Sequence, residues 1–226
     1  MNFDKFTGKA KAYAAARPSY PAEAVEYIMS LVPKNSVFAD IGAGTGRFSE
    51  LIAKKGNTLY AVEPNPDMRE QLYISLGHFP NASIVDGNSS DTTLASQTID
   101  VITSAQALHW FNLEKYMVEC SRIGKSSYWI IIIYNDHSEP SKKSHREIAV
   151  ESFLTAPEVK HFRNDLVYTR ERWLTFMTSH SSDPSPDSDG YEAHMIRMND
   201  LFDASQKDGL MHVEETTKVF SQRYSN

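Results

Sequence analysis

A short apolar run passes directly into a turn with three glycines in the stretch Phe38-Ala39-Asp40-Ile41-Gly42-Ala43-Gly44-Thr45-Gly46. A helical pattern begins at Arg47, so the order is strand, glycine-rich turn, helix. Glycine lets the backbone turn sharply and come close to a ligand, and the free N–H groups at a helix start favour an anionic group. The stretch predicts a βα unit with a ligand site at its turn. Alone, the same turn could be required only for its backbone angles.

Short β-branched or aromatic runs alternate with longer helical patterns on both sides of this turn. We expect strands at 36–41, 58–63, 82–86, 99–104 and 127–134. We expect helices at 22–32, 47–55, from Pro66 onward and at 113–122, with a loop or short helix at 87–98. This alternation is typical of βαβ units, whose right-handed crossovers place helices on both faces of a parallel sheet. The sequence predicts an α/β fold with the strand order 3-2-1-4-5.

The two ends of the chain differ from this core, which we assign to residues 36–136. Residues 1–35 are predicted to be helical and to pack beside the sheet. Residues 137–210 are predicted as a helical addition, with a short strand at 166–169 and a Ser/Asp/Pro-rich loop at 181–190. A helix from Tyr191 to about Lys207 ends the addition, and residues 211–226 are expected to hold a final strand.

Composition narrows the class of protein. The chain has 226 residues and a formal charge of −6. It has no block of Lys and Arg residues, so binding to nucleic acid is disfavoured. Cys120 is the single cysteine, so the chain cannot form an intrachain disulfide. The most apolar run, residues 129–134, is far shorter than the about 20 residues that span a bilayer. From the charge, the single cysteine and the short apolar run we expect a cytoplasmic chain without nucleic-acid or membrane partners. We expect no metal, because the eight histidines show no spacing typical of metal ligands. The oligomeric state stays open.

Two acidic residues at strand ends give the turn its chemistry. A dinucleotide fingerprint would place its third glycine at position 47, which is Arg47, so pyrophosphate binding is disfavoured. Asp40, two residues before Gly42, would repel a pyrophosphate and attract an ammonium or sulfonium group. Glu63 ends the second strand and is placed to accept hydrogen bonds from both ribose hydroxyls. The predicted ligand is a positively charged nucleoside with an unmodified ribose.

The glycine turn, Asp40 and Glu63 together resemble the S-adenosyl-L-methionine (SAM) site of class I methyltransferases. Further segments, in the same order, are similar to the trans-aconitate methyltransferase branch, which has a type 11 methyltransferase domain: Phe3-Asp4-Lys5-Phe6, Tyr13-Ala14-Ala15-Ala16-Arg17-Pro18-Ser19-Tyr20-Pro21 and Ala105-Gln106-Ala107-Leu108-His109-Trp110-Phe111. The resemblance covers roughly residues 3–111. It implies a single Rossmann-like methyltransferase domain over residues 1–226, with SAM as cofactor and residues 1–35 as a lid.

The resemblance also implies which residues hold the cofactor. Those around the methionine part are Asp40, Gly42, Gly44 and Gly46, and Ala43 and Ala105 are further cofactor-binding candidates. Glu63 would bind the ribose, and Asn65 and Met68 would flank the adenosine. The family's Gly-x-Ala-Glu after the third strand reads Gly87-Asn88-Ser89-Ser90-Asp91 here, so Asp86, Asn88 and Ser89 are the candidates for the adenine contact.

The acceptor side is predicted after the fourth strand, because the strand order places residues 105–111 across the switch point from the glycine turn. Gln106 and His109 are the catalytic candidates. The substrate-binding candidates are His109, Trp110, Trp173 and a lid formed by Tyr13, Arg17 and Tyr20, in which Arg17 would hold a carboxylate. Each of these residues could instead have a purely structural role. His109 would then belong to an aromatic cluster, Arg17 to a surface ion pair and Trp173 to the hydrophobic core.

These residues predict a SAM-dependent methyltransferase acting on a small molecule, with a carboxylate among the candidate acceptors. A carboxylate is already ionised, so it would not need a general base. The alternative is a SAM-binding regulatory module or pseudoenzyme that transfers nothing. An NAD-dependent oxidoreductase is disfavoured by Arg47 and Asp40. Nucleic-acid methylation is disfavoured by the charge and by the absence of an Asn/Asp-Pro-Pro-Tyr/Phe motif after the fourth strand.

Overall fold

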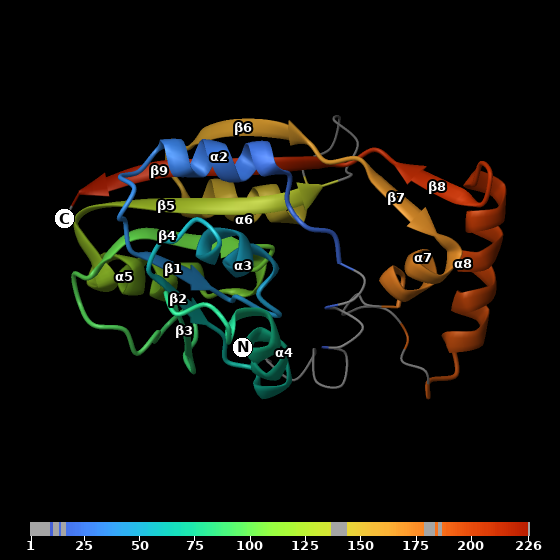
Figure 1. Ribbon diagram of the computed structural model, residues 1–226, viewed down its shortest axis with the longest axis horizontal. Helices are drawn as coiled ribbons and strands as arrows, with labels where there is room; N and C mark the ends of the chain where they lie inside the picture. The colour runs from blue at the N-terminus through green and yellow to red at the C-terminus, as the bar shows by residue number, and fades with distance from the viewer. Residues whose placement is uncertain are drawn as a thin grey trace.

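The structure is a computed structural model that describes residues 10, 14, 17–136, 144–178, 184 and 187–225 (Figure 1). Its helices are α2 (Ala22–Ser30), α3 (Arg47–Ala53), α4 (Pro66–Leu76), the 3₁₀ helix η2 (Leu108–Trp110), α5 (Leu113–Ile123), α6 (His145–Phe153), α7 (Arg170–Phe176) and α8 (Tyr191–Ser205). Its strands are β1 (Phe38–Ile41), β2 (Leu59–Val62), β3 (Ala82–Val85), β4 (Ile99–Ala105), β5 (Gly124–Asp136), β6 (Glu158–Arg163), β7 (Leu166–Thr169), β8 (Leu210–Val213) and β9 (Thr216–Ser225). The core strands and helices therefore lie close to their predicted ranges.

Seven strands form the main sheet in the order β3-β2-β1-β4-β5-β9-β6. Strands β1 to β5 are parallel, and their order confirms the predicted 3-2-1-4-5. β9 and β6 extend the sheet beyond β5 as antiparallel strands. The molecule has the predicted Rossmann-like α/β fold. Its strand order reverses between β1 and β4, and ligands of such sheets bind at the carboxyl ends of the strands beside the reversal.

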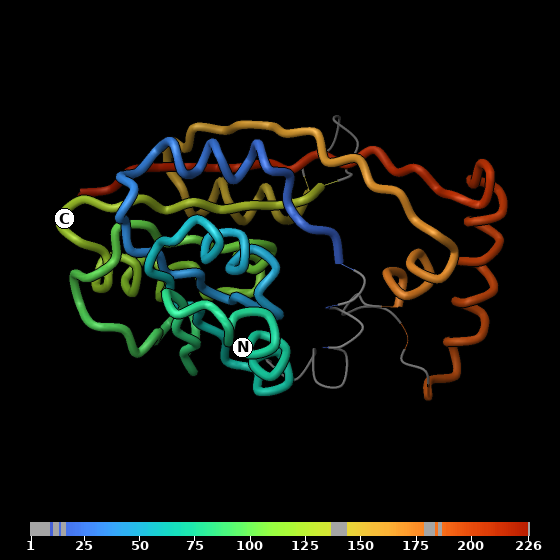
Figure 2. The backbone as a smooth tube through the Cα atoms, in the orientation of Figure 1, coloured from blue at the N-terminus to red at the C-terminus, as the bar shows by residue number. Residues whose placement is uncertain are grey.

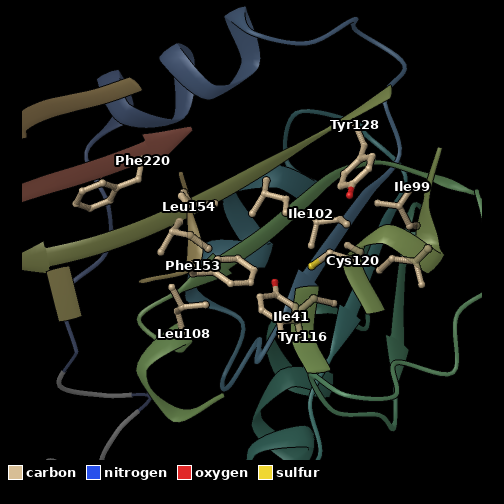
Figure 3. Close-up of a cluster of buried hydrophobic side chains, with 14 of the residues drawn as sticks. Ile41, Ile99, Ile102, Leu108, Tyr116, Cys120, Tyr128, Phe153, Leu154 and Phe220 are labelled. Atoms are coloured by element: carbon tan, nitrogen blue, oxygen red, sulfur yellow. The ribbon is translucent and has the colours of Figure 1, made fainter. Parts of the chain in front are cut away.

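Helices cover both faces of the sheet (Figures 1 and 2). α2, α3 and α4 pack on one face through a cluster that includes Ile28, Ile52 and Leu72. α5 and α6 pack on the other face, where the rings of Tyr116 and Phe153 stack with centroids 5.0 Å apart (Figure 3). Burying a large apolar side chain stabilises a fold by about 1.5–3 kcal/mol. The two clusters therefore hold the helices on the sheet, and so position the strand ends at which the candidate site lies.

A smaller unit lies beside the main sheet. β7 pairs with β8 in an antiparallel ribbon, and α7 and α8 pack against each other and against this ribbon. Its side chains form a separate cluster of Tyr168, Trp173, Phe176, Phe202 and Met211. Figures 1 and 2 show the unit set apart at the right of the view, connected to the main sheet through the β6–β7 and β8–β9 links.

The 137–210 addition, predicted to be helical, contains strands as well as helices. The short strand at 166–169 is confirmed as β7. Residues 158–163, expected within a helical stretch, instead form β6 and pair with β9 along their whole length. The helical expectation is wrong there because five of the six side chains are exposed, so no buried stripe marks the strand. Backbone pairing with β9 determines its conformation instead of a local pattern.

Both ends of the chain also depart from the simplest expectation. The C-terminal region holds two strands, β8 and β9, where a single strand was expected, and they belong to different sheets. Within the core, α5 passes into β5 at Gly124 without an intervening turn.

At the N-terminus α2 confirms the predicted helix, whereas most of residues 1–16 lie outside the described residues. The lid therefore stays a prediction.

Candidate active site

The turn after β1 lies against the loop after β4. The N–H groups of Gly42 and Ala43 donate to the carbonyl oxygen of Val62, at 2.9 and 3.0 Å, which ties the turn to the end of β2. Gly42 has a φ of +73°, and a Cβ there would lie 2.8 Å from the Cβ of Ala107. Only glycine permits both the left-handed backbone and this close approach. The glycine at position 42 thus brings the two loops beside the strand-order reversal together.

Glu63 joins the turn after β1 to the start of α4. Its Oε2 accepts a hydrogen bond from the N–H of Gly44, and its Oε1 accepts one from the N–H of Asn65, both at 2.9 Å. The side chain is 7% exposed, and burial raises the pKa of its carboxyl. Each carboxylate oxygen can accept more than one hydrogen bond, so both stay able to accept a hydroxyl of a ribose. The ribose role of Glu63 stays a prediction.

Asp40 lies beneath the turn instead of at its mouth. The side chain is 1% exposed and accepts hydrogen bonds from Ser49 Oγ at 2.5 Å and Thr103 Oγ1 at 3.0 Å. Burial raises the pKa of Asp40 to about 6, against the lowering effect of these two hydrogen bonds. At neutral pH Asp40 is therefore largely a buried carboxylate, and its contribution to cofactor binding stays a prediction.

The adenosine candidates differ in how their polar groups are used. Asn65 Oδ1 accepts from the N–H of Met68 at 3.0 Å, so Asn65 caps α4 while Met68 packs in the interior. Asn88 Oδ1 accepts from the N–H groups of Ser90 and Asp91, which stabilises its own turn. Ser89 Oγ is buried and has no hydrogen-bond partner among the described residues. Ser89 thus has the polar group that a bound base could use.

Two features of the described residues fit the predicted cofactor. A Cβ built on Gly44 would meet no atom within 4 Å in the part of the chain that the structure describes, so the turn is open there. The donor set is also suitable, because the carboxylate of Glu63 suits a diol, and the unpartnered hydroxyl of Ser89 suits a base. Gly46 differs from Gly44, since a Cβ there would lie 2.7 Å from a side-chain carbon of Leu72. Gly46 therefore serves the packing of the turn on α4.

On the acceptor side, Gln106 has an unusual backbone. Its φ of +59° is in the left-handed region, which is rare for residues other than glycine and recurs at functional sites. Its N–H donates to the carbonyl oxygen of Ile133 at 2.9 Å, and its Nε2 donates to that of Asn135 at 3.2 Å. Gln106 thus joins β4 to β5 just after Ala105, and its amide is held at this edge of the sheet.

His109 is hydrogen-bonded to the hydroxyl of Tyr134. The Tyr134 hydroxyl accepts from the backbone N–H of His109 and lies 3.2 Å from its Nδ1. Burial, reinforced by the charge of Arg146 and by His145, lowers the pKa of His109 to about 3. The imidazole is therefore neutral at physiological pH. If the tyrosine hydroxyl donates to Nδ1, the histidine proton resides on Nε2.

The residues predicted to form the lid and the acceptor pocket pack against different parts of the structure. The Arg17 guanidinium lies over the ring of Phe176, 5.3 Å from its centroid, and Trp173 donates its Nε1–H to Met198 O at 3.1 Å. Arg17 therefore contacts the smaller unit, and Trp173 belongs to the core of that unit. Tyr20 packs edge-on against Phe48 of α3. Trp110 packs on His109, with ring centroids 4.8 Å apart, and Tyr13 lies outside the described residues.

Sequence reasoning missed the residues that surround His109 from β5 and α6. These are Tyr134, His145 and Arg146. The strand and the helix were expected, but no local pattern indicated that these positions face η2. The packing of α6 against η2 brings His145 and Arg146 to His109, whereas Tyr134 reaches it from β5.

With this geometry established, comparison with known proteins decides the kind of domain. A family model described as a methyltransferase domain matches residues 39–132, from β1 into β5. Over these residues the chain is similar to methyltransferase domains. The matched stretch includes the glycine turn, Glu63 and the His109 loop. The trans-aconitate branch within this class stays a prediction.

Relatives of this methyltransferase domain come from distant organisms. A methyltransferase-like protein of Schizosaccharomyces pombe is 31% identical over 130 residues, which are 56% of this chain and 50% of that protein. A protein of Dictyostelium discoideum named as a methyltransferase is 27% identical over 232 residues, 94% of this chain and 84% of that one. The chain thus spans about half the length of the first relatives it matches, and what the whole protein does is a matter for proposal.

Solved structures share the fold. One described as a type II methyltransferase from Anaeromyxobacter dehalogenans superimposes with a TM-score of 0.69 at 17% identity, covering 92% of this chain and 97% of that one. Phosphoethanolamine N-methyltransferase 2 of Haemonchus contortus, solved in complex with SAM, gives a TM-score of 0.56 at 13% identity, covering 98% of this chain and 59% of that one. At these identities the likeness concerns the fold of the methyltransferase domain alone.

Two kinds of feature are absent from the described residues. Within this part of the chain, no group of three or more His, Cys, Asp or Glu side chains could hold a metal ion. Among the helices described, none has the length and apolar character needed to cross a bilayer.

Gly44→Ala is expected to abolish measurable SAM binding while the methyltransferase domain stays folded. Gly44 has a φ of +58° and Gly56 one of +84°, and a Cβ at either would meet no atom of the described residues within 4 Å. Both alanine variants should therefore lose a similar about 1–2 kcal/mol of stability from the left-handed backbone. Only the Cβ at 44 would enter the predicted cofactor space. Calorimetric titration with SAM checks this, and equal SAM affinity of the Gly44→Ala and Gly56→Ala variants would contradict it.

Proposed function

We propose that the chain transfers a methyl group from SAM to a small-molecule acceptor. The observation that carries the proposal is the position of Glu63, whose carboxylate joins the N–H groups of Gly44 and Asn65 beside the strand-order reversal. A buried carboxylate at this point suits a ribose diol and does not suit a phosphate chain. The methyltransferase domain over residues 39–132 supports the same reading.

The side chains of the site have separable tasks. When bound, SAM supplies a methyl group on a positively charged sulfur. Glu63 would orient the ribose, and the buried charge of Asp40 would favour the cationic ligand over a neutral one. Gly44 would let the backbone lie against the ligand. Alignment of the acceptor with the methyl group can account for about 7–11 kcal/mol of barrier lowering in well-ordered systems.

The state of His109 supports a carboxylate as the acceptor. A histidine with a pKa of about 3 is a weak base at neutral pH and would not remove a proton efficiently from an alcohol or amine. A carboxylate carries no such proton. In this role His109 donates a hydrogen bond to the acceptor, and Tyr134 keeps the imidazole in the required tautomer.

Incubation with methyl-labelled SAM and a panel of organic acids, alcohols and amines tests the proposal. We expect label in one or more organic acids and none in the alcohols or amines. Calorimetry with S-adenosylhomocysteine (SAH), run in parallel, gives the affinity of the same sample for the spent cofactor. Tight SAH binding with no labelled product from any class would favour the SAM-binding regulatory module. Absence of both binding and product would reject the proposed function.

A further inference from the structure

A cationic side chain lies beside His109 at the acceptor edge of the sheet. Arg146 is in the first turn of α6, and α6 packs against η2, which carries His109. Its guanidinium carbon lies 5.7 Å from the centroid of the Tyr134 ring, and its Nη1 donates to Asn135 O at 3.1 Å. The carbonyl of Asn135 also accepts from Gln106. Arg146 is thus held against the residues that we place on the acceptor side.

No carboxylate of the described residues neutralises this charge. Salt bridges within 4.0 Å involve other pairs, and the buried Nε of Arg146 has no hydrogen-bond acceptor in the part of the chain that the structure describes. The carboxylates nearest along the chain, Asp136 and Glu147, instead contact Lys218 Nζ at 3.1 and 2.8 Å. The Lys218 side chain is 16% exposed, so this ion group is largely buried. Arginine stays charged at every physiological pH.

The other polar side chains around Arg146 offer hydrogen-bond donors. The Gln106 amide is anchored through Nε2, and His109 presents Nε2–H when Tyr134 donates to its Nδ1. His145 packs edge-on against His109, with centroids 5.2 Å apart. A fixed cation among donors attracts an anion and disfavours a cation or an apolar group.

We propose that Arg146 binds an anionic group of the acceptor, a carboxylate, and so selects organic acids as substrates. The proposal rests on the proposed function and assigns the charge recognition within it. It moves this role from Arg17, whose guanidinium lies over Phe176 in the smaller unit, to a residue packed beside His109. The planar fork of arginine matches a carboxylate through two parallel hydrogen bonds. Among the described residues, Nη1 is the one guanidinium nitrogen of Arg146 with a hydrogen-bond partner.

Calorimetry of the SAH-saturated full chain tests this inference, with acetate, succinate and tricarballylate as the probes. We expect the wild-type chain to bind at least one of them, and Arg146→Gln to bind it about 10- to 100-fold more weakly. Arg146→Lys keeps the charge without the fork and should be intermediate. The affinity for SAH and the unfolding temperature should stay unchanged in both variants. With a methylated acid as product, KM should rise more than kcat falls.

Arg197→Gln is the matched control, because it removes the same charge from an exposed position on α8. It should leave carboxylate binding unchanged. The inference is wrong if the SAH-saturated chain binds none of the three acids, or if Arg146→Gln binds them as tightly as wild type. A wild-type chain that fails to bind SAH is a different result, because it rejects the proposed function on which the inference rests.

Discussion

Glu63→Gln is expected to weaken SAM binding by about 10- to 100-fold. The carboxylate of Glu63 now accepts from two backbone N–H groups, at Gly44 and Asn65. An amide of the same shape has one oxygen, so one of these N–H groups would face an NH₂ group and lose its acceptor. The variant also loses the negative charge that strengthens hydrogen bonds to ribose hydroxyls. Both effects act on the loops that we expect to contact the ribose.

The measurement is calorimetric titration with SAM and SAH. Glu70→Gln removes the same charge from an exposed position on α4 and should bind both ligands like the wild type. A finer comparison uses 5′-methylthioadenosine and its 2′-deoxy form. Wild type should prefer the ribose form, and Glu63→Gln should lose most of this preference. A Glu63→Gln variant with wild-type SAM affinity would remove the main support for the proposed function.

The core elements could be predicted from the sequence because their signals are local. Pro66 follows Asn65, whose side chain caps α4, so the start of that helix is encoded in two adjacent residues. The strand order followed from the alternation of strands and helices together with the general handedness of crossovers. β6 has no such signal, since its exposed side chains carry no periodic pattern and its partner β9 lies far along the chain.

The candidate site divides in the same way. The glycine turn and Glu63 are recognisable by residue type and spacing, and the structure brings them together through the Gly44 hydrogen bond. Arg146 was missed because an arginine in the first turn of a helix is ordinary until that helix packs on η2. The burial of Asp40 was also not predictable, since it depends on Ser49 and Thr103 from two other elements.

Asp40→Asn is expected to raise the free energy of unfolding by up to about 3 kcal/mol at pH 8 and to leave it nearly unchanged at pH 4. Burial raises the pKa of Asp40 from 3.8 to about 6 in the folded chain. Below pH 3.8 the carboxyl is protonated in both states and costs nothing. Between these two values the unfolded chain loses its proton first, so stability falls as the pH rises. Above about 6 the folded chain carries the full penalty of a buried charge.

Asparagine fits the same position. Ser49 Oγ can still donate to the amide oxygen, and Thr103 Oγ1, which also lies 3.4 Å from Ala39 O, can accept from the amide nitrogen. Urea unfolding at the two pH values measures the effect, with Asp200→Asn on the exposed side of α8 as the charge-matched control. A variant that is less stable than wild type at pH 8, or a difference that does not change with pH, would contradict the prediction.

A buried charge that lowers stability is understandable if a ligand uses it. SAM carries a sulfonium charge that SAH lacks, so Asp40→Asn should weaken SAM binding more than SAH binding. In the wild-type chain, SAM affinity should fall as the pH drops through about 6, because protonation removes the charge. Glu63 has a raised pKa as well and is present in both proteins, so the part of the pH dependence that disappears in Asp40→Asn belongs to Asp40. Equal losses for SAM and SAH would show instead that Asp40 only shapes the turn.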